Sequence, residues 1–214
     1  LSSAASDVYK RQVYWKLFGK QIKIPKGKSK IKVINVIPKQ LITKLSIEKI
    51  HEENGYATAD TQNDILKIAV IERHKASGNI GLGFVKGFGL KTGAIASTIA
   101  HDSHNMIVIG TNDDDMYYAA NQLVKSQGGK IIVENGKTLA QLKLPIGGLM
   151  SEEPAEIVME KLQALEKTAS DIGCKINDPF MSMAFLSLSV IPEIKITDKG
   201  LIDVGKFEVT NLFE

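Results

Sequence analysis

The run ILKIAVI at Ile65–Ile71 constrains the fold most, because it is apolar at every position except Lys67. An amphipathic helix or a half-exposed strand would show a period of 3.6 or 2 residues, and this run shows neither. It is rich in β-branched residues and is bounded by polar turns, a pattern typical of a strand with both faces covered. The sequence therefore predicts a buried central strand here, with much of the remaining chain supporting it.

Further elements are predicted on both sides of this strand. A helix from about 113 to 127 is indicated by Thr111 or Asn112 as a cap, by three Asp residues in its first turn, and by Gly128-Gly129 as its stop. A second helix, about 151–172, is predicted with Ser151 as its N-cap, and its apolar residues share one face. The predicted strands are Lys32–Ile37, Gln40–Leu45, Gly93–Ala100, Met106–Gly110, Lys130–Glu134, Thr138–Leu144, Lys195–Asp198 and Leu201–Val204.

Together these elements predict an α+β fold with mixed, mainly antiparallel β-sheets and two main packed helices. Asn135-Gly136 predicts a tight type I′ hairpin between two of the strands. The polar stretch from His51 to Asp64 is expected to be a loop with an exposed His51. The tail Phe207–Phe213 is apolar and is expected to dock.

The glycine-dense segment Gly78–Gly89 does not carry a nucleotide-binding motif. Its spacing misses G-x-G-x-x-G by one residue, no helix is predicted after it, and no Gly-Lys-Ser/Thr is present. A nucleotide-binding module is therefore the weakest functional interpretation. We expect these glycines to permit tight turns and close backbone approach within a sheet.

Composition excludes several classes of protein. The single cysteine, Cys174, permits neither an intramolecular disulfide nor a cysteine-based zinc site, and it is expected to be a buried thiol in a reducing cytoplasm. A net charge of +3 does not suggest nucleic acid as a partner. No apolar run has the roughly 20 residues of a membrane-spanning helix, so no membrane association is expected.

Polar side chains gather where predicted strands end. Glu72, Arg73 and His74 follow the central strand, and His101, Asp102, His104 and Asn105 occupy one turn between two strands. Such a group could bind a metal, hold a polar substrate or shuttle protons, since neutral imidazole suits all three. It could equally be a turn whose Asp and Asn bond the local backbone.

The residues alone supply no complete active site. The sequence has no H-x-H pair, no H-E-x-x-H, no C-x-x-C and no G-x-S-x-G elbow. A metal-dependent deaminase of the H-x-E and P-C-x-x-C type is also excluded, because one cysteine cannot supply that site.

Several segments of the sequence resemble a known family. GFVKGFGLKTGAIASTIAHDSHNMIVIGTNDDDM is similar to the C-terminal part of bacterial adenine deaminases, and other segments agree in order over roughly Val33–Phe213. These segments are LKIAVIERHKASGNIGLGF, LPIGGLMSEEPAEIV, NDPFMSMAFLSLSVIPEIKITDKGLIDV and KFEVTNLF.

The resemblance implies a metal-dependent amidohydrolase that hydrolyses adenine to hypoxanthine and ammonia in purine salvage. It implies a divalent manganese or iron ion held mainly by an N-terminal (β/α)₈ barrel, which begins its ligand set with an H-x-H pair and is absent from this sequence. A cytoplasmic homo-oligomer is expected, with the barrel domain and adenine as partners. No metal ligand is assigned within this sequence, which is expected to be inactive alone.

The domain organisation expected from the resemblance has three parts. Residues 1–12 are expected to be a non-native adapter or linker. Residues 13–44 are expected to be the linker and a strand remnant from the upstream barrel and β-sandwich, and residues 45–214 the C-terminal domain. The site hypothesis is that His101, Asp102, His104 and Asn105, with Glu72 and His74, line the active site or bind substrate. The alternative is a structural or oligomerisation domain with no direct part in catalysis.

Overall fold

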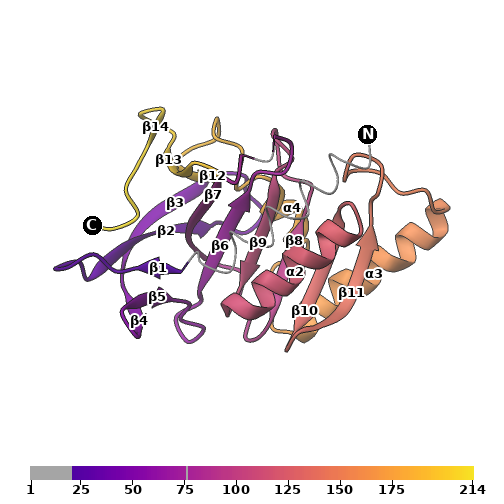
Figure 1. Cartoon of the computed structure of the whole chain (residues 1–214), viewed down its shortest axis with the longest axis horizontal. Helices are drawn as coiled ribbons and strands as arrows, with labels where there is room; N and C mark the ends of the chain where they lie inside the picture. Colours follow the sequence, from indigo (N-terminus) through magenta and orange to yellow (C-terminus); the bar gives the residue numbers. More distant parts are fainter. Residues whose placement is uncertain (1–20, 76) are drawn as a thin grey trace.

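The computed structural model describes residues 21–75 and 77–214, and an eight-stranded sheet forms its centre (Figure 1). Segment 1–12 and the first residues of the predicted linker, 13–20, lie outside the described residues. The strand order in the central sheet is β11-β10-β8-β9-β6-β7-β2-β3. In chain order these strands are β2 (Lys30–Val36), β3 (Thr43–Lys49), β6 (Ile65–Ile71), β7 (Ile80–Lys86), β8 (Ala94–Ser97), β9 (Met106–Gly110), β10 (Gly129–Glu134) and β11 (Lys137–Lys143).

The predicted central strand is confirmed, because all seven residues of β6 are buried. β6 pairs antiparallel with β7 on one side and with β9 on the other. The mixed character comes from β2 and β7, which run parallel through a short register at Ile34 and Asn35. β2 lies within the segment 13–44 and is a full member of the central sheet.

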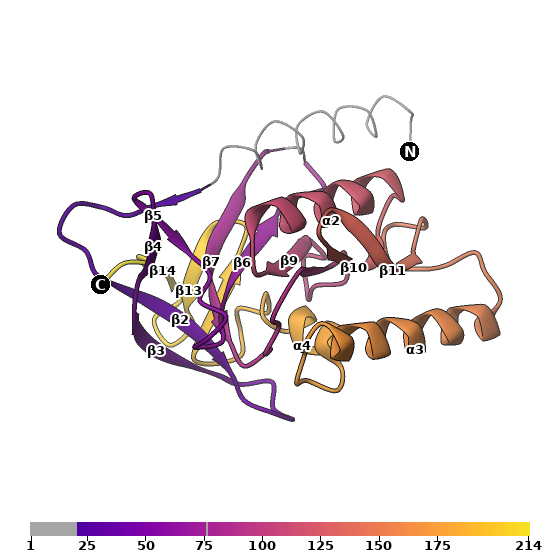
Figure 2. The ribbon, with the colours of Figure 1, turned by 90° about the horizontal axis from the view of Figure 1, so that it is seen from below.

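Each face of the central sheet is covered by a helical layer and a small sheet (Figures 1 and 2). Ala69 and Ile71 of β6 point to helix α2 (Asp113–Lys125), and Ile68 and Val70 point to the opposite layer. That layer contains α3 (Ala155–Asp171), α4 (Pro179–Ala184) and the sheet of β12 (Ile194–Thr197), β13 (Gly200–Asp203) and β14 (Glu208–Val209).

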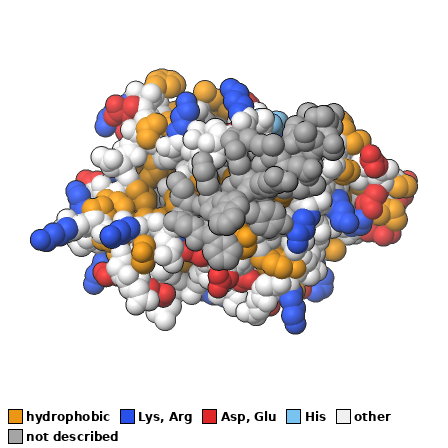
Figure 3. All heavy atoms as spheres, in the orientation of Figure 1, with side chains coloured by type: hydrophobic (Ala, Val, Ile, Leu, Met, Phe, Trp, Pro, Cys, Tyr) orange, Lys and Arg blue, Asp and Glu red, His pale blue; other side chains and the backbone are white. Residues whose placement is uncertain are grey.

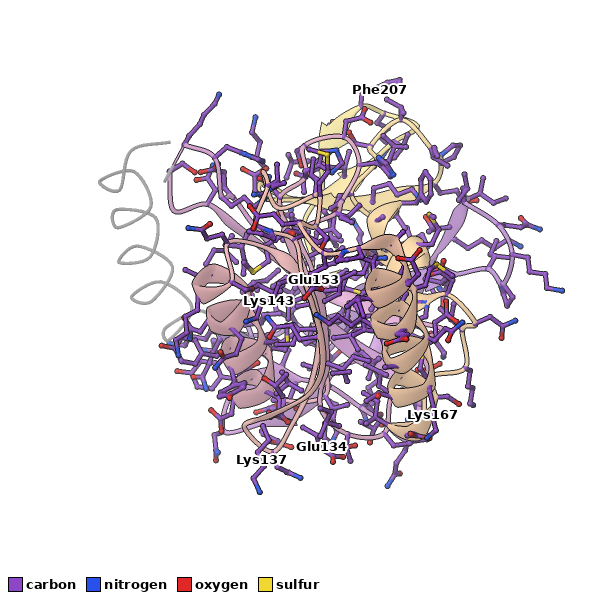
Figure 4. The ribbon with its side chains drawn as sticks, turned by 90° about the vertical axis from the view of Figure 1, so that its right-hand side faces the viewer. Glu134, Lys137, Lys143, Glu153, Lys167 and Phe207 are labelled. Atoms are coloured by element: carbon purple, nitrogen blue, oxygen red, sulfur yellow. The ribbon has the colours of Figure 1, made fainter. Side chains whose placement is uncertain are left out.

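The second small sheet shares the α2 face and is formed by β1 (Ile22–Lys23), β5 (Tyr56–Thr58) and β4 (His51–Glu53). Figure 4 looks onto the β11 side of the molecule and shows α2 and α3 on opposite sides of the central sheet. The α+β class with mainly antiparallel sheets is therefore confirmed, and the described residues contain no closed barrel.

The first predicted helix is confirmed and the start of the second is wrong. Asn112 caps α2, since its side-chain oxygen accepts from the Asp115 amide at 2.8 Å. α3 begins at Ala155 rather than at 151, so Ser151 is not its N-cap. The reason is Pro154, whose ring disfavours helical backbone at Glu153 and thereby delays the helix.

Two hairpins turn at an Asn-Gly pair, and only one of them was predicted. Asn135 and Gly136 both have positive φ between β10 and β11, which confirms the predicted type I′ turn. Asn54 and Gly55 have the same left-handed backbone between β4 and β5, so the loop prediction for this stretch was wrong. His51 is exposed, as expected, but it lies in β4 rather than in a loop.

The glycines of β7 permit close packing of the small sheet that contains β12 and β13. A Cβ on Gly81 would lie 1.9 Å from the Thr197 carbonyl oxygen, and a Cβ on Gly83 would lie 3.1 Å from Ile196 Cδ1. Gly87 and Gly89 have positive φ in the following turn. These positions confirm the expected roles in turns and in close backbone approach.

The chain end docks only in part. Phe213 bridges to Ile31, and the Lys32 amide donates to the Leu212 carbonyl at 2.8 Å. Phe207 is 79% exposed and projects from the molecule in Figure 4. The buried thiol of Cys174 agrees with expectation.

The outer surface carries mixed charge. On the face seen in Figure 3, the Lys and Arg side chains of the described residues are scattered among acidic and apolar ones rather than gathered in a stripe. Among the described residues, no helix combines the length and the apolar character that crossing a bilayer requires.

Candidate functional site

Strand pairing brings the two sequence-predicted polar segments to the same end of the central sheet. Ile71, the last residue of β6, pairs with Met106, the first residue of β9, and Ser97, the last residue of β8, pairs with Ile107. The residues after β6 therefore lie beside the turn that joins β8 to β9. We call the resulting group the polar cluster; it consists of Glu72, Arg73, His74, His101, Asp102, His104 and Asn105.

Glu72 anchors the segment that follows β6. One carboxylate oxygen accepts from the amides of His74 and Lys75, and the other accepts from the amide and hydroxyl of Ser77, both at 2.9 Å. Burial alone would raise the pKa of Glu72, but these hydrogen bonds outweigh it and hold the pKa below its usual range. Glu72 is thus ionised, and both of its carboxylate oxygens accept hydrogen bonds that hold the turn from His74 to Ser77.

Arg73 joins three parts of the site and was not among the predicted site residues. Its Nε donates to the His104 carbonyl, and its Nη2 donates to the Gly147 carbonyl at 2.8 Å. A Cβ on Gly148 would lie 2.7 Å from Arg73 Nη1, so the glycine pair lets this loop approach the guanidinium. The Arg73 guanidinium therefore fixes the backbone carbonyl of His104.

His74 reaches across to the other segment. Its Nε2 lies 2.7 Å from the Ser103 carbonyl oxygen. A carbonyl oxygen can only accept, so Nε2 must carry the proton in this contact. The exposed ring of His74 thus ties the end of β6 to the turn between β8 and β9.

His101 and His104 form a ring pair inside this turn. Their ring centroids are 5.5 Å apart in an edge-on arrangement, and the ring centroid of Phe185 lies 4.9 Å from that of His101. The His101 amide also donates to the Ala184 carbonyl of α4 at 2.8 Å. Both rings are half-buried.

His104 presents a buried nitrogen with no hydrogen-bond partner among the described residues, its Nδ1. Burial, followed by the positive charges of His101, Arg73 and His74, lowers the pKa of His104, and the charge of Asp102 opposes this. His104 is therefore a neutral imidazole near pH 7, which can accept or donate one hydrogen bond.

Asn105 fixes the base of the cluster. Its Nδ2 donates to Asp198 Oδ1 at 3.3 Å, and Asn79 Nδ2 donates to the other Asp198 oxygen at 3.2 Å. Asn105 is 4% exposed, so its amide is part of the packing between the central sheet and the β12–β13 turn. Asp102 lies exposed at the tip of the turn.

The structure thus divides the six predicted residues into two groups. The side chains of Glu72, Asn105 and His74 are engaged in hydrogen bonds that hold the turns, whereas His101, Asp102 and His104 place titratable side chains on the turn between β8 and β9. Arg73 was expected at the end of the central strand with Glu72 and His74, but its contacts with His104 and Gly147 could not be expected from its position. Asp198 is 93 residues away from its partner and carried no local signal.

The cluster does not make a metal site by itself. Across residues 21–75 and 77–214, no group of three or more His, Cys, Asp or Glu side chains could hold a metal ion. A metal that acted at this cluster would need its ligands from elsewhere.

Comparisons with known proteins agree with the resemblance found in the sequence. Residues 40–208 match the family model described as adenine deaminase C-terminal domain. An adenine deaminase of Desulfatibacillum aliphaticivorans is 51% identical over 196 residues, which cover 92% of this chain and 34% of that protein. Adenine deaminases of Dehalococcoides mccartyi and Brucella abortus are 48% and 50% identical over 89% and 84% of this chain, and over 33% and 31% of their own lengths. The chain therefore spans about a third of the length of the curated relatives it matches.

Proposed function

The chain belongs to the adenine deaminase family, as its C-terminal domain, and on this premise we propose that it works as the C-terminal domain of an enzyme that hydrolyses adenine to hypoxanthine and ammonia. In this proposal the polar cluster lines the mouth of an active site whose remaining parts belong to an upstream (β/α)₈ barrel. The metal, manganese or iron, is proposed to be bound mainly by that barrel. The setting is purine salvage in the cytoplasm.

One observation carries the site assignment: Nδ1 of His104, beside the His101 ring, is buried and has no hydrogen-bond partner among the described residues. Adenine offers ring nitrogens as acceptors and an exocyclic amine as a donor. A neutral imidazole matches either, and replacement of the amine by water at C6 requires protons to move to the leaving ammonia. His101 and His104 are proposed to bind the base or to carry such a proton, while Glu72, Arg73 and Asn105 hold them in place.

The test requires the missing part of the enzyme. Residues 21–214 would replace the corresponding C-terminal third of the Desulfatibacillum relative, and the fusion would be assayed for ammonia release from adenine with manganese. His101→Ala and His104→Ala are expected to lower kcat/KM at least tenfold, since general acid–base groups contribute about 10²–10⁴ in rate.

A matched control is His51→Ala, which removes an exposed histidine in β4, a strand of the separate sheet β1-β5-β4. Its kcat and KM should equal those of the parent fusion. If the His101 and His104 variants also retain the parent's kcat and KM, the proposed site role is wrong. The isolated chain is expected to release no ammonia from adenine with manganese.

The alternative, a structural or oligomerisation domain, is favoured by exposed apolar side chains on β3, the edge strand of the central sheet, although the Thr43 and Leu45 amides on it already donate to the Pro192 carbonyl and the Glu193 carboxylate. β3 ends the strand order, and Leu45 and Ile47 on it are 40% and 41% exposed, next to Leu41 and Ile42 at 47% and 43%. An edge strand with apolar side chains is a common pairing surface. The apolar face of α3 does not serve such a role, because it packs on the core of this chain through Leu165 and Ala169.

The two functions can be separated by one double variant. Leu45→Lys with Ile47→Lys in the active fusion should leave kcat unchanged and reduce the sedimentation coefficient if β3 forms the interface of a homo-oligomer. An unchanged sedimentation coefficient would count against β3 as that interface.

A further inference from the structure

A cavity of about 510 Å³ lies between the segment that joins β2 to β3 and helix α4. Its volume is in the range of small-molecule sites, roughly 300–1,000 Å³. Most of its wall is apolar. The apolar lining includes Val36, Pro38, Leu41, Met181, Phe185 and Leu186.

The cavity contains a buried lysine. Lys195 lies on β12, has no exposed surface, and lines the cavity. Its Nζ donates to the Leu41 carbonyl at 2.8 Å. No acidic side chain of the described residues forms an ion pair with it.

Such a group is costly in an apolar environment. An ammonium has three N–H donors, and a single carbonyl satisfies one of them. Burial lowers the pKa of Lys195 to about 8, which leaves the amine mostly protonated at pH 7. The other charged side chains that line the cavity, Lys39, Lys175 and Asp178, are exposed at its rim. A buried cation without an anion, in a cavity of ligand size, is complementary to an anionic ligand.

We propose that this cavity binds a small, mostly apolar carboxylic acid: the covered Lys195 side chain shifts so that its Nζ donates to the carboxylate, while the hydrocarbon part of the acid lies against the apolar wall. A carboxylate supplies the missing acceptors and the missing charge together, and charge-assisted hydrogen bonds are about twice as strong as neutral ones. The site is independent of the deaminase proposal, because it uses none of the residues of the polar cluster.

The probes are octanoate and 1-octanol, which share a hydrocarbon chain and differ in the charged group. Calorimetric titration of the 214-residue chain at pH 7 should show octanoate binding at least tenfold more tightly than 1-octanol. Lys195→Met should weaken octanoate binding at least tenfold and leave 1-octanol binding within twofold. Lys175→Met, the matched control at the rim, should leave octanoate binding within twofold.

Three results would overturn the proposal: no octanoate binding, equal affinities for the two probes, or an equal effect of the two lysine variants. If Lys195→Met fails to fold, the pH dependence of the unchanged chain decides. Octanoate affinity should fall from pH 7 to pH 10 as Lys195 loses its proton, while 1-octanol affinity stays constant. Equal pH dependence of the two probes contradicts the proposal.

Discussion

The ring of Phe185 lies 4.9 Å from the ring of His101, with the two planes inclined by 35°. Phe185 also lines the cavity that contains Lys195. A single aromatic side chain at the end of α4 therefore forms a wall common to the polar cluster and the cavity. The position of His101 consequently depends on packing in the α4 layer as well as on its own turn.

Replacing Phe185 by Leu should move His101 without disrupting the fold. Phe185 is half-buried and Leu keeps most of the hydrophobic volume, so the exchange should cost less unfolding free energy than a Phe→Ala change in a core, which costs about 3–5 kcal/mol. The loss of the neighbouring aromatic ring should change the ¹H NMR shifts of the His101 ring. The His51 resonances serve as the control and should stay in place. An unchanged His101 spectrum would show that the two rings are not in contact in solution.

Rules that act over a few residues predicted much of the fold. The unbroken apolar run predicted β6, Asn135-Gly136 predicted the β10–β11 hairpin, and the capping residues Thr111 or Asn112 predicted the start of α2. The same rules would also have placed the β4–β5 hairpin, since Asn54-Gly55 carries the same turn signal. The wrong start of α3 came from giving more weight to a capping serine than to the restriction that Pro154 places on Glu153.

The candidate site was predictable in position but not in its connections. Polar residues at the ends of neighbouring strands indicated where the polar cluster lies. The contacts of Arg73 with Gly147 and of Asn105 with Asp198 join residues 74 and 93 positions apart, and no local pattern encodes them. Lys195 was also hidden, because a lone lysine in a strand pattern gives no sign that its amine is buried.

Replacing Glu72 by Gln should destabilise the chain in a pH-dependent way. A carboxylate accepts all of the hydrogen bonds at this turn, whereas the amide NH₂ of Gln would face N–H donors, at a cost of about 1–3 kcal/mol. The pKa of Glu72 is lowered by folding, so its stabilising contribution is present above about pH 4.5 and is lost as the pH falls through the lower folded pKa.

Urea unfolding of both chains from pH 7 to pH 3 measures this effect. The free energies of unfolding should differ most at neutral pH and converge in acid. A constant difference over the whole range would mean that the Glu72 carboxylate is not preferentially ionised in the folded chain.

Lys195→Met should change the alkaline limb of the stability profile. Folding lowers the pKa of Lys195 from 10.5 to about 8, so between these values the unfolded chain binds more protons than the folded chain. The contribution of Lys195 to stability therefore rises with pH through this window, by at most about 3 kcal/mol. Below pH 8 the native lysine is destabilising, and the Met variant should be the more stable chain.

The measurement is urea unfolding of the two chains at pH 7, 8, 9 and 10. Other lysines and tyrosines titrate in the same range, so only the difference between the two chains is informative. That difference should shrink from pH 8 upward. Parallel profiles would show that Lys195 keeps an ordinary pKa in the folded state.

Gly81→Ala, which adds a single methyl group, should lower the free energy of unfolding far more than the same change at Gly205. The added Cβ would lie 1.9 Å from the Thr197 carbonyl oxygen and 2.8 Å from the Gly200 amide nitrogen, and both are backbone atoms that can yield only if the β12–β13 hairpin moves off β7. Overpacking of this kind costs about 1–3 kcal/mol. Gly205→Ala is the matched control, because its Cβ would lie 3.5 Å from Asp203 Oδ1, an ordinary contact, and should cost less than about 0.5 kcal/mol. Thermal unfolding of both variants measures the difference, and equal losses would contradict the close packing of this hairpin on β7.

Since β12 carries Lys195 and the turn after it carries Asp198, displacement of the hairpin by Gly81→Ala should also weaken octanoate binding, whereas Gly205→Ala should not.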